Sequence, residues 1–340
     1  MMMIRMKVPD KFVLEKSVCN HGFFMMAPNS WNPQTKTLVR PLRLQDQTSV
    51  TVSISQHSRM MISVKLDDDH HHFKITKAIK KAIKYQVKRM LRLSEEEDER
   101  INEFHKLHSD AAENGFGRLF RNPSVFEDIL KTWLLCCCRF KESLEKAELL
   151  CKVTRIKKRG RRKQGYKEPI ANFPTAQELS KLDIKTLATE CKLGIRAEKI
   201  LKFSKDVASG EINLLDFENV RDGDELYRKL MTIDGIGDFI ACNVLMCMGF
   251  YNRVPVDSET VRHIKQLHGR EDCDRKNVAK MCEEIYNKYN PFHTLAYWFE
   301  LVEYYESKVG KLSMLEKCNY QRVAGSFIDK SNSTPSSSPT

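Results

Sequence analysis

The sequence predicts an α+β fold that is mostly α, in which an N-terminal antiparallel β domain precedes an all-helical body. Apolar and polar residues alternate over residues 11–75, most clearly at residues 49–55 and 61–66, and turn residues separate these runs. From about residue 75 to residue 311 the apolar residues recur at helical spacing instead. The chain has 340 residues, 41% of them hydrophobic, so it is long enough to bury a substantial core.

We predict four segments along the chain. They are an antiparallel β domain at residues 1–75, a helical domain at residues 76–222 with a basic loop at residues 155–167, a helix-hairpin-helix region with closing helices at residues 223–312, and a disordered tail at residues 320–340. The end of the tail is rich in Ser, Thr and Pro and lacks apolar residues over residues 331–340, which is typical of disordered chain.

The distribution of charge indicates a polyanionic partner. The chain carries 57 Lys and Arg against 45 Asp and Glu, which gives a net charge of +12. Basic residues concentrate at residues 157–163, a run that fits a nuclear-import patch, a phosphate-contacting loop or a merely solvated segment. A second basic stripe, at residues 77–88, is interpreted as the solvated face of a helix. We therefore expect a nuclear protein.

The cysteine content, the length of the apolar runs and a run of histidines bear on three other classes: secreted, membrane-spanning and metal-binding proteins. The eleven cysteines, many of them at apolar helical positions, indicate reduced thiols in the cytosol or nucleus. No apolar run is long enough to span a bilayer, so we expect no membrane partner. Residues 67–72 read Asp-Asp-Asp-His-His-His, but consecutive side chains in an exposed turn point in different directions. We expect a solvated hairpin tip there and no metal site.

A glycine turn between two helices is the first candidate functional motif. Apolar residues fall at helical spacing over residues 224–231 and again over residues 239–248. Gly235 and Gly237 lie between these runs, and glycines can adopt positive φ and admit a close neighbour. The amides that begin the second helix lack partners within it and can bind phosphate, although tight helix packing alone would also use such glycines. The predicted hairpin consists of Gly235, Ile236, Gly237 and Asp238.

A single carboxylate follows the second helix. Residues 254–257 read Val-Pro-Val-Asp, and the proline favours an extended segment before a new helix at residues 258–267. Asp257 is therefore expected at or near a helix N-cap, where Asp is favoured even without another function. Capping and chemistry can be carried by the same side chain.

The order and spacing of these motifs resemble the HhH-GPD superfamily of base-excision DNA glycosylases, in which a catalytic Asp follows a helix-hairpin-helix and a Gly/Pro-rich stretch. Residues 193–200 are similar to the turn before the hairpin in 8-oxoguanine and 3-methyladenine glycosylases. Residues 126–139 are similar to the family's buried helix and DNA-wedge loop, and residues 289–298 to its closing helix. The resemblance implies a two-lobed helical body, Asp257 as the catalytic residue, and a monomer that binds double-stranded DNA containing a damaged base.

Position 239 narrows the chemistry that the resemblance implies. In family members that also cleave the sugar-phosphate backbone, this position holds a lysine whose amine forms a Schiff base. This chain has Phe239 instead. The resemblance thus implies a monofunctional glycosylase that flips out an alkylated or oxidised base and hydrolyses its N-glycosidic bond. The alternatives are a non-catalytic DNA-binding protein with this fold, or a glycosylase and lyase that uses an amine from elsewhere.

The resemblance also bears on cofactors. It allows a monovalent cation at carbonyls of the hairpin. The iron-sulfur cluster of some members needs four closely spaced cysteines near the C-terminus, and after Cys282 only Cys318 remains, so no cluster is expected.

Further site residues are suggested by alignment with the family's pattern. Cys138 or Arg139 aligns with the residue that fills the gap left by a flipped base, although buried cysteines closing a helix would explain the same segment. Many members have a histidine two residues after the catalytic Asp that contacts a phosphate, and here Glu259 would repel that phosphate. Arg262 and His263 are the substitute candidates. The candidates for the base pocket, with core packing as the alternative, are Phe23, Phe24, Trp31, Phe239, Tyr297 and Trp298.

Overall fold

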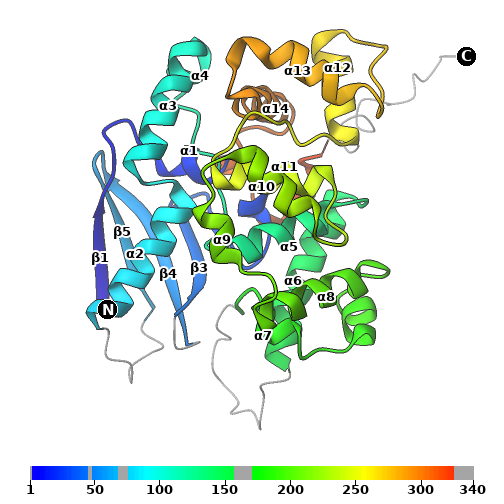
Figure 1. Cartoon of the computed structure of the whole chain (residues 1–340). Coiled ribbons are helices and arrows are strands. Elements are labelled where there is room, and N and C mark those ends of the chain that lie inside the picture. Colours follow the sequence, from blue (N-terminus) through cyan, green and yellow to red (C-terminus); the bar gives the residue numbers. More distant parts are fainter. Residues whose placement is uncertain (1, 45–47, 68–75, 157–170, 325–340) are drawn as a thin grey trace, which may run out of the picture.

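The computed structural model describes residues 2–44, 48–67, 76–156 and 171–324 (Figure 1). Three predicted features fall on other residues. They are the acidic and histidine run beyond Asp67, the basic run at residues 157–163, and residues 325–340 of the predicted tail, and for these the prediction stands untested. The first residues of that tail, 320–324, are described by the structure, and Tyr320 among them is buried.

The N-terminal part forms one antiparallel sheet with the strand order β1-β5-β4-β3-β2. Its strands are β1 (Met2–Lys7), β2 (Ser30–Asn32), β3 (Thr37–Arg43), β4 (Ser49–Ser58) and β5 (Met61–Leu66). The sheet begins earlier than the alternation from residue 11 indicated, because β1 pairs along all of β5. Ile4 and Met6 of β1 are buried while Arg5 and Lys7 are exposed, which is the alternation that a half-buried edge strand requires.

The rest of the described chain is mostly helical, and helices pack against the sheet (Figure 1). They are α2 (Lys77–Leu91), α3 (Glu95–Leu107), α4 (Ser109–Glu113), α5 (Val125–Leu135), α6 (Phe140–Ile156), α7 (Ala176–Leu179), the π-helix η3 (Thr186–Glu190), α8 (Arg196–Ser209), α9 (Leu214–Asn219), α10 (Gly223–Met231), α11 (Asp238–Met248), α12 (Ser258–His268), α13 (Val278–Tyr286) and α14 (His293–Val309). Short helices also occur as α1 (Leu14–Val18), η1 (Gly22–Met25), η4 (Asn287–Tyr289), η5 (Leu312–Met314) and η6 (Lys317–Arg322). This confirms the predicted α+β fold, which is mostly α.

A buried ion network joins the sheet to the helices. Arg40 of β3 lies 3.0 Å from the carboxylate of Glu127 in α5, and the amine of Lys131 lies 2.8 Å from the same carboxylate. All three side chains are buried. Because a buried charge is tolerated only when it is paired, this network fixes how the sheet docks on α5.

The two most buried helices are α5 and α11, which pack against each other near the centre of the molecule. One hydrophobic core extends from Ile4 in the sheet through Leu130 of α5 to Leu245 of α11. The predicted segment boundaries at residues 75 and 222 stay predictions. In the part of the chain that the structure describes, no helix has both the length and the apolar character needed to cross a membrane.

Candidate active site at the start of α12

Asp257 is the N-cap of α12, as the residue pattern predicted. Its Oδ1 accepts hydrogen bonds from the amides of Glu259 and Thr260, at 2.9 and 3.0 Å, and from the Thr260 hydroxyl at 3.2 Å. The Asp257 amide in turn donates to the Thr260 hydroxyl, which completes a capping box. Within the described residues all these bonds reach Oδ1, so Oδ2 is left for solvent or a ligand.

The environment of Asp257 combines exposure with desolvation. The residue is exposed, yet desolvation by the surrounding protein raises the pKa of its carboxyl, and the hydrogen bonds from Thr260 and Glu259 only partly oppose this effect. The two observations are compatible because one edge of the carboxylate can face solvent while protein atoms surround the rest. This is the environment of an accessible carboxylate whose charge is not fully stabilised by water.

The predicted hairpin connects α10 and α11, whose bounds agree with the predicted helices to within one residue. Gly235 has φ +86°, and a Cβ atom there would lie 2.6 Å from Cζ2 of Trp133 in α5. Gly237 differs from the expectation, since its φ is −107° and a Cβ atom would meet no atom of the described residues within 4 Å. Gly235 is therefore needed for the conformation of the turn. Gly237 has no side chain to cover its backbone, which stays accessible to a binding partner.

The start of α11 keeps its amide donors for such a partner. Gly237 is the N-cap, and no side chain among the residues that the structure describes caps the helix. The first amides of a helix have no partner within it and carry the positive end of the helix dipole. Ile236 is buried under the turn, while the carboxylate of Asp238 accepts a hydrogen bond from the Tyr227 hydroxyl at 2.9 Å. The exposed donors are thus held by an anchored hairpin.

The C-terminal end of α5 contacts the hairpin and lies near Asp257. Trp133 contacts Gly235. Burial raises the pKa of Cys136, three residues further on, and the carboxylate of Asp257 adds a smaller effect in the same direction. Arg196, the first residue of α8, donates to the carbonyl of Cys137 at 3.2 Å. The hairpin, the loop after α5, the start of α8 and Asp257 are therefore assembled around one helix end.

The loop after α5 separates the two wedge candidates. The thiol of Cys138 points inward, donating to the Leu134 carbonyl at 3.0 Å and lying 3.2 Å from the Ser143 hydroxyl. Arg139 is exposed, and within the described parts of the chain its ion pair is with nearby Glu142, at 2.8 Å. A side chain bound inward cannot fill a gap in DNA without breaking these bonds, so the structure argues against Cys138 and leaves Arg139.

One exposed apolar residue near this loop was not singled out from the sequence. Ile195 is 96% exposed, directly before Arg196, which binds the loop after α5. Its signal in the sequence is an apolar residue directly after Gly194, in a turn that enters a helix.

The aromatic candidates for a base pocket divide by burial. Phe23 and Phe24 are fully buried, and Phe24 packs edge-on against Tyr320, so these two predictions are corrected to core residues. Trp31 is buried and donates from its indole to the Ser313 carbonyl at 2.7 Å, which assigns it to the core as well. The tight packing of the N-terminal segment against the helices, which sequence does not reveal, explains the correction.

Trp298 and Phe239 remain the candidates with accessible surface, since both are half-buried. The indole nitrogen of Trp298 is buried without a hydrogen-bond partner among the described residues, and the ring lies 4.6 Å from that of His21, measured between centroids. Burial, with Arg92 and Lys131 nearby, lowers the pKa of His21 to about 3, so its imidazole is neutral. Tyr297 is buried and its hydroxyl contacts that of Thr260 at 3.1 Å.

The two predicted phosphate contacts are not placed to serve as such. His263 is buried, and its Nε2 lies 3.1 Å from the carboxylate of Glu300. Arg262 lies 2.5 Å from the carboxylate of Glu259 and stacks on the ring of Tyr304. The ion pair with Arg262 alters the expectation for Glu259, because it neutralises the charge that was expected to repel a phosphate.

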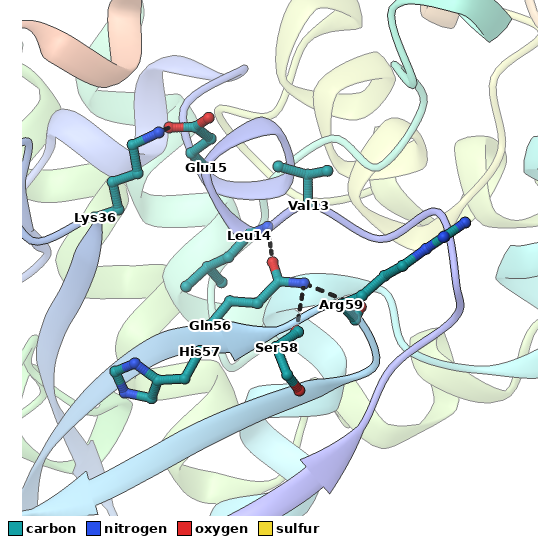
Figure 2. Close-up of a pocket in the computed structure, with 8 residues that line it drawn as sticks. All are labelled: Val13, Leu14, Glu15, Lys36, Gln56, His57, Ser58 and Arg59. Carbon is teal, nitrogen blue, oxygen red and sulfur yellow. Dashed lines mark hydrogen bonds and ion pairs between the residues drawn. The ribbon is translucent and has the colours of Figure 1, made fainter.

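An open pocket elsewhere on the molecule is unrelated to this site (Figure 2). It lies between α1 and the β4-β5 hairpin, and Gln56 holds its wall together by accepting from the Leu14 amide at 2.8 Å. Lys36 and Glu15 form an ion pair of 2.8 Å at its edge. None of the predicted site residues lines it.

Comparisons with known proteins reveal similarity of structure. No protein-family model and no curated protein matches the sequence. A 3-methyladenine DNA glycosylase from Archaeoglobus fulgidus is similar in structure, with a TM-score of 0.65 and 19% identity over 89% of this chain and 98% of that one. The 8-oxoguanine glycosylase/lyase of Clostridium acetobutylicum is similar in its apo form, with a TM-score of 0.63 and 17% identity over 88% and 95% of the two chains.

The same clostridial enzyme has also been solved with double-stranded DNA containing cytosine opposite 8-oxoguanine. That structure has a TM-score of 0.61 and 18% identity, and the match covers 89% of this chain and 98% of the other. The similarity thus spans nearly the full length of each of these proteins, the sheet as well as the helices. The protein described here therefore has the fold of the 3-methyladenine and 8-oxoguanine DNA glycosylases.

Proposed function

We propose that the protein is a monofunctional DNA glycosylase of base excision repair, which hydrolyses the N-glycosidic bond of an alkylated or oxidised base flipped out of double-stranded DNA. The placement of Asp257 carries this proposal. Its carboxylate is fixed by the α12 cap through Oδ1, presents Oδ2, and lies at the same end of α5 as the hairpin. The shared fold with DNA glycosylases supports the proposal.

The chemistry follows from the charge that develops on the sugar. Cleavage of an N-glycosidic bond leaves positive charge on the deoxyribose, in an oxocarbenium-like transition state. The Asp257 carboxylate stabilises this charge electrostatically, and Oδ2 can orient the attacking water. Because the cap already holds the carboxylate in place, little reorganisation is needed when the charge appears.

The hairpin holds the DNA beside this carboxylate. The exposed amides at Gly237 and the start of α11 bind a backbone phosphate, and the absence of a side chain at Gly237 lets the phosphate come close. Arg139 and Ile195, exposed near the loop after α5, are the side chains placed to fill the gap left by the flipped base. A monovalent cation at the hairpin stays a prediction, and none of these steps depends on it.

The excision of a base from a panel of duplexes tests the function itself. We expect the purified full chain to release free base from at least one duplex in a panel of alkylated, oxidised and deaminated substrates. A protein that binds these duplexes but releases no base would support the non-catalytic alternative.

The monofunctional subtype makes a separate prediction about covalent trapping. Phe239 has no amine, and the nearby amine of Lys199 is paired with the carboxylate of Asp234. We therefore expect borohydride to trap no covalent complex with abasic or damaged DNA, whereas an enzyme that forms a Schiff base would be trapped. Denaturing gel electrophoresis measures this. A trapped band would establish the glycosylase and lyase alternative.

The raised pKa of Asp257 makes a prediction about pH. Only the ionised carboxylate can stabilise a cationic sugar, so the rate of excision falls as the pH drops through this pKa. Since desolvation raises the pKa, the acid limb of the rate lies at a higher pH than the ordinary pKa of an aspartate would give. Single-turnover rates measured against pH test this. An acid limb at or below the ordinary aspartate value would contradict the proposed environment.

We also infer a nuclear location and a monomeric state. The net charge of +12 and the basic run at residues 157–163 support the first. The second rests on the resemblance to the glycosylase family.

A further inference from the structure

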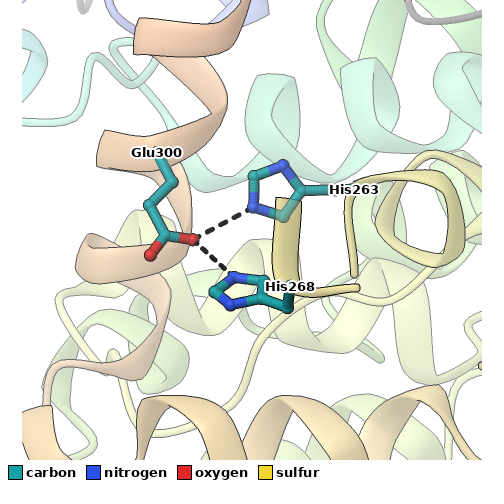
Figure 3. A group of neighbouring side chains, drawn as sticks. All are labelled: His263, His268 and Glu300. Carbon is teal, nitrogen blue, oxygen red and sulfur yellow. Dashed lines mark hydrogen bonds and ion pairs between the residues drawn. The ribbon is translucent and has the colours of Figure 1, made fainter. Parts of the chain in front are cut away.

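Two histidines and a glutamate meet where α12, α13 and α14 pack together (Figure 3). Nε2 of His263 and Nε2 of His268 lie 3.1 and 3.0 Å from the same oxygen, Oε2 of Glu300. The hydroxyl of Tyr286 also approaches this point, at 2.6 Å from Oε2 and 3.3 Å from each of the two imidazole nitrogens. Four polar atoms from three helices therefore surround one point.

We propose that His263, His268 and Glu300 bind a divalent transition-metal ion of the zinc type, with the Tyr286 hydroxyl beside its fourth position. Imidazole nitrogens and a carboxylate oxygen are ligands that zinc accepts in tetrahedral sites. With metal-ligand distances of about 2.0–2.1 Å, the ligand atoms of a tetrahedral site are about 3.3 Å apart. The observed spacings of 3.0 and 3.1 Å between the nitrogens and Oε2 are close to that value, and all three ligand atoms lie within 4.8 Å of one another.

The position of the cluster suits a buried site that an ion can still reach. The side chain of His263 is 1% exposed, while those of His268 and Glu300 are 22% and 21% exposed. The buried His263 is held in place by packing, because its ring lies edge-on against that of Tyr297 with 5.2 Å between ring centroids. The partial exposure of the other two ligands gives a metal ion access from solvent.

The bound ion would link α12 to α14. His263 and His268 belong to α12, and His268 is its last residue, whereas Glu300 lies in the middle of α14. Two imidazoles and a phenol share one carboxylate oxygen of Glu300 through hydrogen bonds. A metal ion replaces those bonds with stronger ones between the same helices. The inference concerns binding and stability, so it does not depend on the proposed glycosylase activity.

Metal binding by the full chain tests the proposal directly. The chelator-treated protein is titrated with Zn²⁺ under reducing conditions, and binding is followed by calorimetry and by the melting temperature. We expect one tight equivalent that raises the melting temperature. His268→Gln should weaken this binding by at least about tenfold, the scale on which loss of even a supporting group acts at metal sites. His57→Gln, which changes an exposed histidine far from the cluster in sequence, is the matched control and should bind as the unaltered chain does.

The eleven cysteines require a second readout, because thiolates also bind zinc. Co²⁺ in place of Zn²⁺ should give the visible spectrum of a tetrahedral site without the charge-transfer band of a thiolate ligand. A thiolate band, or equal zinc binding by the unaltered chain and His268→Gln, would overturn the proposal. Glu300→Gln provides a further test if it folds, and the cobalt spectrum of the unaltered chain decides the matter if it does not.

Discussion

Asp257→Asn is expected to lower the single-turnover rate of base excision by roughly 10²- to 10³-fold, the usual cost of removing one preorganised electrostatic contact to a transition state. The amide oxygen of Asn can still accept the bonds from Glu259 and Thr260, and Asn is as good an N-cap as Asp. The substitution therefore removes the charge and keeps the local structure. Melting temperature and DNA affinity should change little.

Asp222→Asn provides the matched control for this prediction. Asp222 caps α10 by accepting from the Asp224 amide at 2.9 Å, at the end of that helix away from the hairpin. The same chemical change there should leave the rate of excision unaltered. If Asp257→Asn excised the base as fast as the unaltered chain, Asp257 would be a capping residue and nothing more.

Gly235→Ala is expected to destabilise the protein by about 1–3 kcal/mol and to weaken DNA binding. A methyl group at Gly235 would lie 2.6 Å from the buried ring of Trp133, and φ of +86° is unfavourable for alanine. The hairpin must shift to relieve both effects, which displaces the amides that hold the phosphate. Thermal unfolding measures the first effect, and fluorescence anisotropy with labelled duplex DNA measures the second.

Gly237→Ala separates packing from binding. At this glycine φ is ordinary and the added methyl group meets nothing within 4 Å in the described part of the chain, so stability should be nearly unchanged. We expect DNA affinity to fall about tenfold, since a hydrogen bond to a charged group contributes about 1.5–3 kcal/mol and the methyl group would hold the phosphate away. Unchanged affinity for Gly237→Ala would show that DNA does not approach this backbone.

The features that the sequence predicted well depend on local signals. The bounds of α10, α11 and α12 follow from helical spacing and from the residues that start and stop helices, so they were predicted to within one residue. The capping role of Asp257 follows from the same local rules. The positive φ at Gly235 was one of two equivalent possibilities, and only the contact with Trp133 from a distant helix distinguishes it from Gly237.

The predictions that failed concerned the direction in which side chains point. Phe23 and Phe24 are covered by elements far along the chain, and no local pattern reveals this. His263 lies on the face of α12 that carries buried Thr260 and Ile264, so the helical period could have identified it as an inward residue. Its meeting with Glu300, 37 residues further along the chain, required the packing of α14 against α12.

The pairing of Arg262 with Glu259 could also have been foreseen, because residues three apart on a helix are neighbours. The contact of Glu259 with Tyr305, at 2.8 Å, could not, since Tyr305 belongs to α14. Glu259, the residue that departs from the family pattern, therefore helps to hold α12 in place through both contacts.

If Asp257 stabilises positive charge on a sugar, the protein should recognise a mimic of the cationic transition state, and this can be measured without knowledge of the damaged base. The measurement compares affinity for two duplexes, one with a cationic pyrrolidine in place of the target sugar and one with a neutral abasic analogue. The unaltered chain should bind the cationic duplex more tightly, and Asp257→Asn should lose that preference while binding the neutral duplex equally well. An equal preference for the cation in both proteins would contradict the account.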